Sequence, residues 1–211
     1  MRFHNLSIPG GSRYHICQVH LVNDIRTLIP FLGSFLSISL CYILDMKTYA
    51  FIDSQNLNLG VRSLGWKLDW KKFRQYLRNK YNVSDAFLFI GYKPGNEALY
   101  TNLQQIGYIV ILKPTMELPD KTVKGNVDAE LVLHTMIQYP DYEKAIIISG
   151  DGDFFCLVEY LEGKNKLLHV LTPNKHYSRL FKKYSGFIVQ VDWLKSSLEQ
   201  KKTGISGRSK P

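Results

Sequence analysis

Short apolar runs alternate with amphipathic segments from residue 46 to about residue 195. Runs that are apolar at consecutive positions are typical of strands buried on both faces of a parallel sheet. The predicted strands are Tyr49–Asp53, Ala86–Gly91, Tyr108–Leu112, Ala145–Ser149 and Leu167–Leu171, with Phe187–Val191 as a candidate last strand.

Between these runs the apolar positions recur with the period of a helix. Asp69 is a suitable cap for the first predicted helix, Gly107 closes the second and Pro140 stops the third. The predicted helices are Asp69–Asn79, Asn96–Gln105, Val127–Tyr139, a segment from about Asp153 to Leu161, and His176–Lys183. Strands and helices in this alternation predict an α/β fold, a Rossmann-like parallel sheet of about five strands with helices on both faces.

The two ends of the chain differ from this pattern. Residues 27–44 are uncharged and as a helix would extend roughly 27 Å, about the length of a membrane span. Pro30, Gly33 and several serines weaken that signal. Residues 1–45 are therefore interpreted as an N-terminal extension, either an over-extended start upstream of Met46 or a membrane anchor. Residues 46–195 form the predicted domain, and residues 196–211 a flexible basic tail.

Composition narrows the range of partners. The 211-residue chain has 27 basic and 18 acidic residues, a formal charge of +9, which favours a polyanion such as nucleic acid. The three cysteines, Cys17, Cys41 and Cys156, include no CxxC pair. That pattern argues against a disulfide scaffold and a cysteine zinc site, and it favours a reducing, cytoplasmic location.

Aspartates gather in three short motifs near the predicted strand ends. Asp53 ends the first strand, Asp151 and Asp153 follow the fourth, and Asp128 begins the helix that leads into the fourth. Ligands of open parallel sheets bind beyond the carboxyl ends of the strands, so a common crevice is expected. Carboxylates select hard cations, which predicts Mg²⁺ or Mn²⁺ held by these four residues. Asn56, three residues after Asp53, is close enough to orient a water or a phosphate oxygen.

Each motif taken alone has a structural explanation. Asp53 suits the cap of a βα turn, and Asp128 suits the positive end of a helix dipole. Asp151-Gly152-Asp153 has the composition of a turn. The simultaneous presence of all three on alternating βα connections favours the metal site.

Three segments, FIDSQNL, KGNVDAELVLH and IIISGDGDF, resemble the NYN domain, the LabA-like branch of the PIN-like nuclease superfamily. The resemblance implies a Rossmann-like fold and a metal-dependent ribonuclease. It assigns the acidic roles to Asp53, Asp128, Asp151 and Asp153, with Asn56 in support. Many relatives carry an Asp six residues after the position of Asp128, where this chain has His134. That residue is either a substitute polar group or a histidine packed on the helix.

Basic residues supply candidate contacts with RNA. Lys121 and Lys124 precede Asp128. A second basic set lies around the short helix 176–183, with Tyr177 and Tyr184 interleaved; its members are Lys175, His176, Arg179, Lys182 and Lys183. Arg179, Lys182 and Lys183 have the i, i+3 and i+4 spacing of a helix and are expected to share one face. Tyrosines beside a basic groove suit single-stranded RNA, whose bases stack on rings. The alternative is a solvated helix face with the tyrosines packed on the core.

The sequence therefore predicts a metal-dependent ribonuclease acting on RNA, single-stranded RNA above all. The alternative is a catalytically weak or inactive RNA-binding or regulatory module of the same fold. No Gly-x-x-x-x-Gly-Lys-Ser/Thr loop and no Gly-x-Ser-x-Gly elbow is present, which argues against a P-loop NTPase and an α/β-hydrolase. A homo-oligomer is left open, and a membrane is a partner only if residues 27–44 span it.

Overall fold

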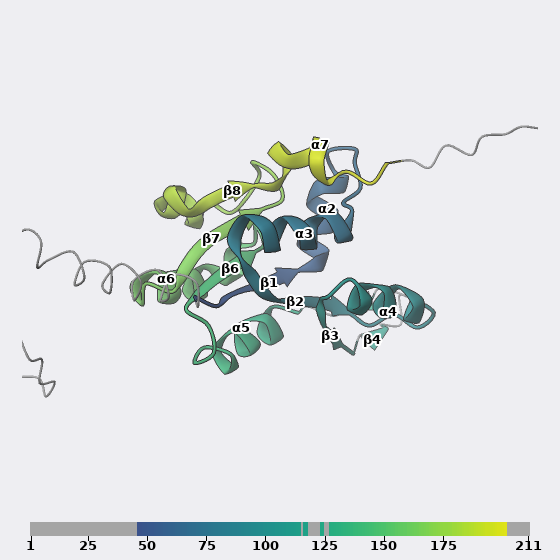
Figure 1. Ribbon diagram of the computed structural model, residues 1–211, viewed down its shortest axis with the longest axis horizontal. Helices are drawn as coiled ribbons and strands as arrows, with labels where there is room; N and C mark the ends of the chain where they lie inside the picture. The colour runs from purple at the N-terminus through teal and green to yellow at the C-terminus, as the bar shows by residue number, and fades with distance from the viewer. Residues whose placement is uncertain (1–45, 115, 118–122, 125–126, 202–211) are drawn as a thin grey trace, which may run out of the picture. The chain divides into compact units, whose positions relative to one another are not determined.

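A six-stranded, wholly parallel sheet forms the centre of the domain (Figure 1). The computed structural model describes residues 46–114, 116–117, 123–124 and 127–201. The strand order is β3-β2-β1-β6-β7-β8, so the first strand of the chain lies in the middle of the sheet. The strands are β1 (Thr48–Asp53), β2 (Val83–Gly91), β3 (Ile109–Lys113), β6 (Lys144–Ile148), β7 (Leu167–Thr172) and β8 (Ile188–Gln190).

Helices cover both faces of the sheet. One face packs against α2 (Ser54–Arg62), α3 (Trp70–Tyr81), α4 (Glu97–Gln105) and α7 (Lys195–Leu198). The other packs against α5 (Asp128–Ile137), α6 (Phe155–Gly163) and the 3₁₀ helix η3 (Arg179–Phe187). The remaining elements are the 3₁₀ helices η2 (Gly152–Phe154) and η4 (Val191–Leu194) and an antiparallel pair, β4 (Met116–Glu117) with β5 (Val123–Lys124).

Alternation along β1 explains how one strand supports both layers. Successive side chains of a strand point to opposite faces, and all six residues of β1 are buried. Ala50 and Ile52 enter the core under α2 and α3, while Tyr49 and Phe51 enter the core under α5 and α6. Full burial of a side chain such as Ile52 contributes roughly 1.5–3 kcal/mol, so β1 stabilises both layers at once.

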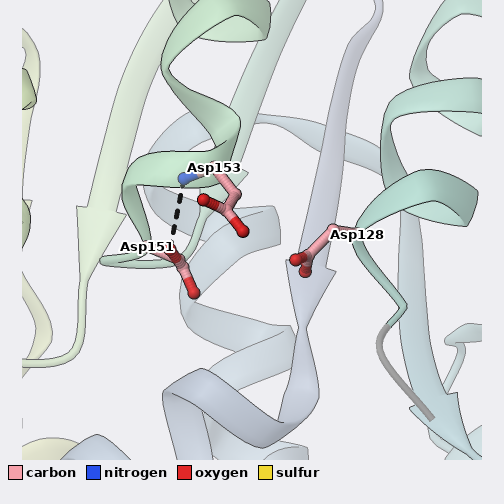
Figure 2. A group of neighbouring side chains, drawn as sticks. All are labelled: Asp128, Asp151 and Asp153. Atoms are coloured by element: carbon pink, nitrogen blue, oxygen red, sulfur yellow. Dashed lines mark hydrogen bonds between the residues drawn. The ribbon is translucent and has the colours of Figure 1, made fainter.

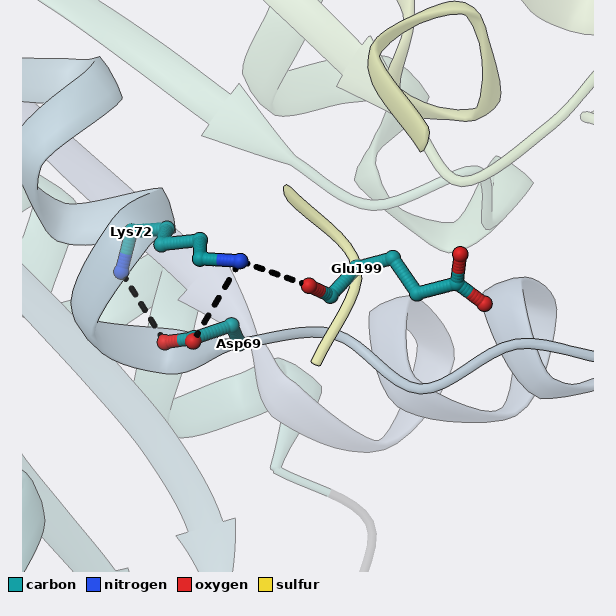
Figure 3. A network of polar contacts seen from close by, with 3 residues as sticks. All are labelled: Asp69, Lys72 and Glu199. Atoms are coloured by element: carbon teal, nitrogen blue, oxygen red, sulfur yellow. Dashed lines mark hydrogen bonds and ion pairs between the residues drawn. The ribbon is translucent and has the colours of Figure 1, made fainter. Parts of the chain in front are cut away.

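The end of the domain is tied to the start of α3. Asp69 caps α3 by accepting a hydrogen bond from the backbone N–H of Lys72 at 3.1 Å, and the Lys72 ammonium donates to the Glu199 carbonyl at 2.7 Å (Figure 3). The backbone N–H of Asp69 also donates to Leu198 O at 2.8 Å. Residues 198–200 therefore belong to the folded domain, although the predicted tail begins at residue 196.

The predicted α/β class with a parallel, doubly covered sheet is confirmed, with six strands in place of about five. Several helices differ from expectation. Helices α2, α7 and η4 were not predicted, and the segment expected as a helix over 176–183 is a 3₁₀ helix that begins at Arg179.

None of the described helices is long and apolar enough to cross a membrane. The predicted extension, residues 1–45, and most of the predicted tail lie outside the described residues.

Candidate metal centre

The connections that follow β1 and β6 leave the sheet toward opposite faces. These two strands are neighbours, and the chain after β1 enters α2 whereas the chain after β6 enters η2 and α6. Such a switch point opens a crevice at the carboxyl edge of a parallel sheet. Because Ile52 pairs with Ile148, the next residues, Asp53 and Ser149, lie side by side at this edge.

Three carboxylates meet at this edge. Asp128, Asp151 and Asp153 each place a carboxylate oxygen within 4.8 Å of the other two. Figure 2 shows Asp128 pointing from the start of α5 toward Asp151 and Asp153 at the end of β6. Asp128 is half-buried, whereas Asp153 is exposed. The structure thus brings together three of the four aspartates predicted from the sequence.

The turn after β6 holds Asp151 and Asp153 in place. Asp151 caps η2, and its Oδ1 accepts a hydrogen bond from the backbone N–H of Asp153 at 3.1 Å. The backbone N–H of Asp151 in turn donates to the Ser149 hydroxyl at 3.1 Å. Gly152 permits close packing, since a Cβ at this position would lie 2.5 Å from the Ser178 hydroxyl. Asp151-Gly152-Asp153 is therefore a turn, as its composition indicates, and the same turn places both aspartates at the edge of the sheet.

Asp53 lies behind the cluster and is not one of its three members. It is 5% exposed, its Oδ1 accepts from the backbone N–H of Asn56 at 3.0 Å, and its Oδ2 accepts from the Ser149 hydroxyl at 3.3 Å. Burial raises the pKa of Asp53, and the nearby charge of Asp128 raises it further, while these hydrogen bonds lower it. Asp53 also caps α2, which agrees with its interpretation as the cap of a βα turn. Ser149, which sequence reasoning did not single out, links this buried carboxyl to the turn that carries the cluster.

Asn56 joins the two strand ends directly. Its side-chain oxygen accepts a hydrogen bond from the backbone N–H of Gly150 at 2.8 Å. A backbone N–H can only donate, so this contact settles the orientation of the amide, and the Nδ2 group points elsewhere. Within the described part of the chain, Nδ2 has no hydrogen-bond partner. Asn56 therefore positions the Gly150–Asp151 backbone and retains a donor.

His134 packs against an aromatic side chain of the sheet. It is half-buried on α5, and its ring lies 5.6 Å from the ring of Phe89, centroid to centroid. It is not a member of the acidic cluster. The contact with Phe89 matches the interpretation of His134 as a histidine packed on its helix.

The predicted RNA contacts are only partly within the described residues. Lys175, Arg179 and Lys182 are exposed on the segment between β7 and β8. Lys121 and the side chain of Lys124 lie outside the described part. Tyr184 is buried, so its ring is not free to stack on a base, whereas Tyr177 is half-buried and packs partly against the same core.

Lys183 turns away from the other basic residues. It pairs with Glu159 of α6 at 2.6 Å and lies over the ring of Phe155. The predicted shared face of Arg179, Lys182 and Lys183 assumed an α-helix. In a 3₁₀ helix positions i and i+3 eclipse, which leaves Arg179 with Lys182 and directs Lys183 toward α6.

The three clustered carboxylates fit a divalent cation. An all-oxygen donor set at least partly open to solvent suits Mg²⁺ or Mn²⁺, which retain several waters. Three negative charges at such separations repel one another, and a bound cation would relieve that repulsion. The donor set thus agrees with the predicted metals and does not distinguish between them.

The fold and this edge define a class of protein. A parallel α/β sheet with the order β3-β2-β1-β6-β7-β8 and acidic side chains at its switch point has the architecture of PIN-like nucleases. Within that class, the chain belongs to the NYN domain family, whose model matches residues 47–193.

Two relatives support this assignment. The chain is 24% identical over 160 residues to the low amplitude and bright protein LabA of Synechococcus elongatus, covering 71% of this chain and 86% of LabA. A solved structure of a protein of unknown function from Vibrio parahaemolyticus superposes with a TM-score of 0.63 at 24% identity. That likeness covers 74% of this chain and 96% of the other, and it shows the same fold.

Proposed function

We propose that this domain is a metal-dependent ribonuclease that hydrolyses phosphodiesters of single-stranded RNA. One observation carries the proposal: Asp128, Asp151 and Asp153 converge from two separate segments at the switch point of a NYN domain. Clustered carboxylates at the carboxyl edge of a parallel sheet are otherwise unfavourable, and binding of a hard cation explains their placement.

In this proposal Asp128, Asp151 and Asp153 hold Mg²⁺ or Mn²⁺, with Asp53 behind them. A divalent cation held there would neutralise charge at the phosphate and lower the pKa of a water molecule. Asp128 reaches the crevice from the opposite side to the other two carboxylates and positions the attacking water (Figure 2). Asp53 and Asn56 act one step removed, by holding Ser149 and Gly150 at the base of the Asp151 turn.

Positive charge on the segment that follows β7 supports RNA as the substrate. Lys175, Arg179 and Lys182 are exposed on the segment after β7, the strand next to β6. Neutralisation of phosphates by such side chains makes binding strongly dependent on salt. The formal charge of +9 agrees with a polyanionic substrate.

The position of Asp53 favours one alternative function. With Asp53 buried and hydrogen-bonded, three carboxylates face the crevice, and the position six residues beyond Asp128 holds His134 packed on Phe89. A site with fewer available ligands binds a cation more weakly. The alternative is therefore an RNA-binding or regulatory module of the same fold that cleaves slowly or not at all.

Cleavage of labelled single-stranded RNA by the full chain distinguishes the two functions. The nuclease requires cleavage with Mn²⁺ or Mg²⁺, its loss in EDTA, and its loss in Asp151→Asn. Asp141→Asn, an exposed carboxylate outside the cluster, is the matched control and should retain activity. Cleavage that survives EDTA or Asp151→Asn contradicts the proposal, and RNA binding without cleavage supports the alternative.

Asp53→Asn tests the role assigned to the buried carboxyl. Loss of a partner that only orients metal ligands costs about 10–100-fold in metal affinity or activity. We expect Asp53→Asn to reduce activity by a factor in that range and Asp151→Asn to reduce activity by a larger factor. A greater loss in Asp53→Asn than in Asp151→Asn would contradict the placement of Asp53 behind the cluster.

A further inference from the structure

A second recess lies on the other side of the Gly150–Asp151 turn from α5. It has a volume of about 350 Å³ and is lined by Asn56 and Leu59 of α2, by Ser63 at the C-cap of that helix, by Gly150, and by Pro173 and His176 from the segment after β7. We call it the α2 hollow. Gly150 precedes Asp151 directly, so the hollow and the acidic cluster share one turn of backbone.

We propose that the α2 hollow binds a nucleobase, that of a nucleotide flanking the phosphate that faces the acidic cluster. The inference rests on the proposed action on RNA and adds a subsite that binds one base of the substrate. A volume of about 350 Å³ lies at the small end of the range for ligand sites, which suits a ring rather than a larger ligand.

The floor of the hollow is built by close packing. A Cβ on Gly60 would lie 2.3 Å from Cβ of Pro173, so glycine lets α2 approach the segment after β7. Asn174 is 6% exposed, and its Nδ2 donates to the Gly60 carbonyl at 2.9 Å. Its Oδ1 accepts from the backbone N–H of His176 at 2.8 Å, which holds His176 at the rim. Packing and hydrogen bonds therefore fix the backbone at the floor of the hollow.

The rim offers the groups that recognise a base. Asn56 presents its Nδ2 donor, because its oxygen is occupied by Gly150. The Ser63 hydroxyl donates to the Gly60 carbonyl at 2.8 Å, which leaves its oxygen as an acceptor. His176 and Leu59 are both exposed and supply an aromatic ring and an aliphatic surface. Rings of this kind stack on the unstacked bases of single-stranded RNA.

The charges around the hollow argue against an anion as its ligand. Among the described residues that line it, none is lysine or arginine, and the carboxylates of the acidic cluster lie just beyond Gly150. A neutral ring with hydrogen-bond donors and acceptors on its edge matches this lining. A phosphate bound there would have no lysine or arginine side chain to neutralise its charge. Phosphates are better served by the exposed Lys175 and Arg179 nearby.

The test is a titration of the ¹⁵N-labelled full chain with uridine, adenosine and inorganic phosphate, in EDTA, followed by two-dimensional NMR. Both nucleosides should shift the amide signals of Ser63, Gly150 and His176, and phosphate should not. His176→Ala should weaken nucleoside binding about fivefold or more, the smallest effect expected for a lost stacking ring. Leu59→Ala should weaken it as well.

Leu133→Ala is the matched control, because Leu133 on α5 is 58% exposed against 56% for Leu59 and lies on the other face of the sheet. It should leave nucleoside binding unchanged. No shift at millimolar nucleoside, or the same shifts with phosphate, overturns the proposal. Since the titration needs neither metal nor cleavage, its result is independent of whether the domain is a nuclease.

Discussion

Replacing Asp153 with asparagine should have opposite effects on stability in EDTA and in Mg²⁺. Asp153 is exposed, and its carboxylate has no hydrogen-bond partner among the described residues. The substitution therefore removes charge from the cluster while it keeps the backbone contact between Asp153 and Asp151. Without metal, loss of one repelling charge should stabilise the fold, and with metal, loss of one ligand should remove stabilisation.

The separations in the cluster set the magnitude. Two unit charges at 4.8 Å repel by about 0.9 kcal/mol in a medium with the dielectric constant of water. Screening at physiological salt reduces each pair by about half. Asp153 has two such neighbours, so Asp153→Asn should stabilise the metal-free domain by about 1 kcal/mol. For a chain of 211 residues this corresponds to a rise in Tm of about 2–4 °C.

Thermal unfolding in EDTA and in a Mg²⁺ series measures both effects. Mg²⁺ at about 100 times its Kd should add about 2.7 kcal/mol to the wild-type chain and clearly less to Asp153→Asn. Asp141→Asn, which removes an exposed carboxylate outside the cluster, should show neither effect. A fall in Tm of Asp153→Asn in EDTA, or an equal gain from Mg²⁺ in both chains, would refute the reasoning.

Two further predictions concern the scaffold. Gly60→Ala should lower the free energy of unfolding by about 1–3 kcal/mol in denaturant titrations, because its Cβ would meet Pro173 at 2.3 Å, whereas Gly163→Ala, with nothing within 4 Å, should not. Burial lowers the pKa of His169 in the folded domain, and the contact of its Nδ1 with Phe187 O opposes that shift. The unfolded chain therefore binds the proton more readily, so stability should fall as pH drops below about 6.5, and His169→Gln should reduce this loss in denaturant midpoints measured across that range.

The strands of the sheet could be predicted because burial on both faces leaves a continuous apolar run in the sequence. Helix α2 was missed for the opposite reason, since its sequence, SQNLNLGVR, combines two asparagines and a glycine that disfavour helices. What stabilises α2 is the Asp53 cap and the burial of Leu57 and Val61, one turn apart. No local sequence pattern predicts the order of the strands in the sheet, because that order depends on how each helix packs between strands that are distant in the sequence.

The sequence predicts which aspartates gather at the acidic site, but it does not predict that Asp53 is buried behind the other three. Asp53 and Asp151 both follow apolar strands, which is a local feature and places both at the carboxyl edge. The two differ in exposure. Asp53 lies on a central strand and is buried, with hydrogen bonds from Ser149 and Asn56. Asp151 lies with Asp153 on a turn that extends beyond the edge of the sheet. Contacts between distant segments decide that difference, and no spacing in the sequence encodes them.

The switch point explains why one turn could serve both chemistry and recognition. Because the chain after β1 and the chain after β6 leave toward opposite faces, the Gly150–Asp151 turn has an acidic cluster toward α5 and the α2 hollow on its other side. Asn56 binds the backbone of that turn from the α2 side, so its amide couples the position of Asp151 to the shape of the hollow. A strand of RNA crossing the edge would then place a base on one side and its phosphate on the other. That geometry requires an unpaired base, which is the physical reason to expect preference for single-stranded substrates.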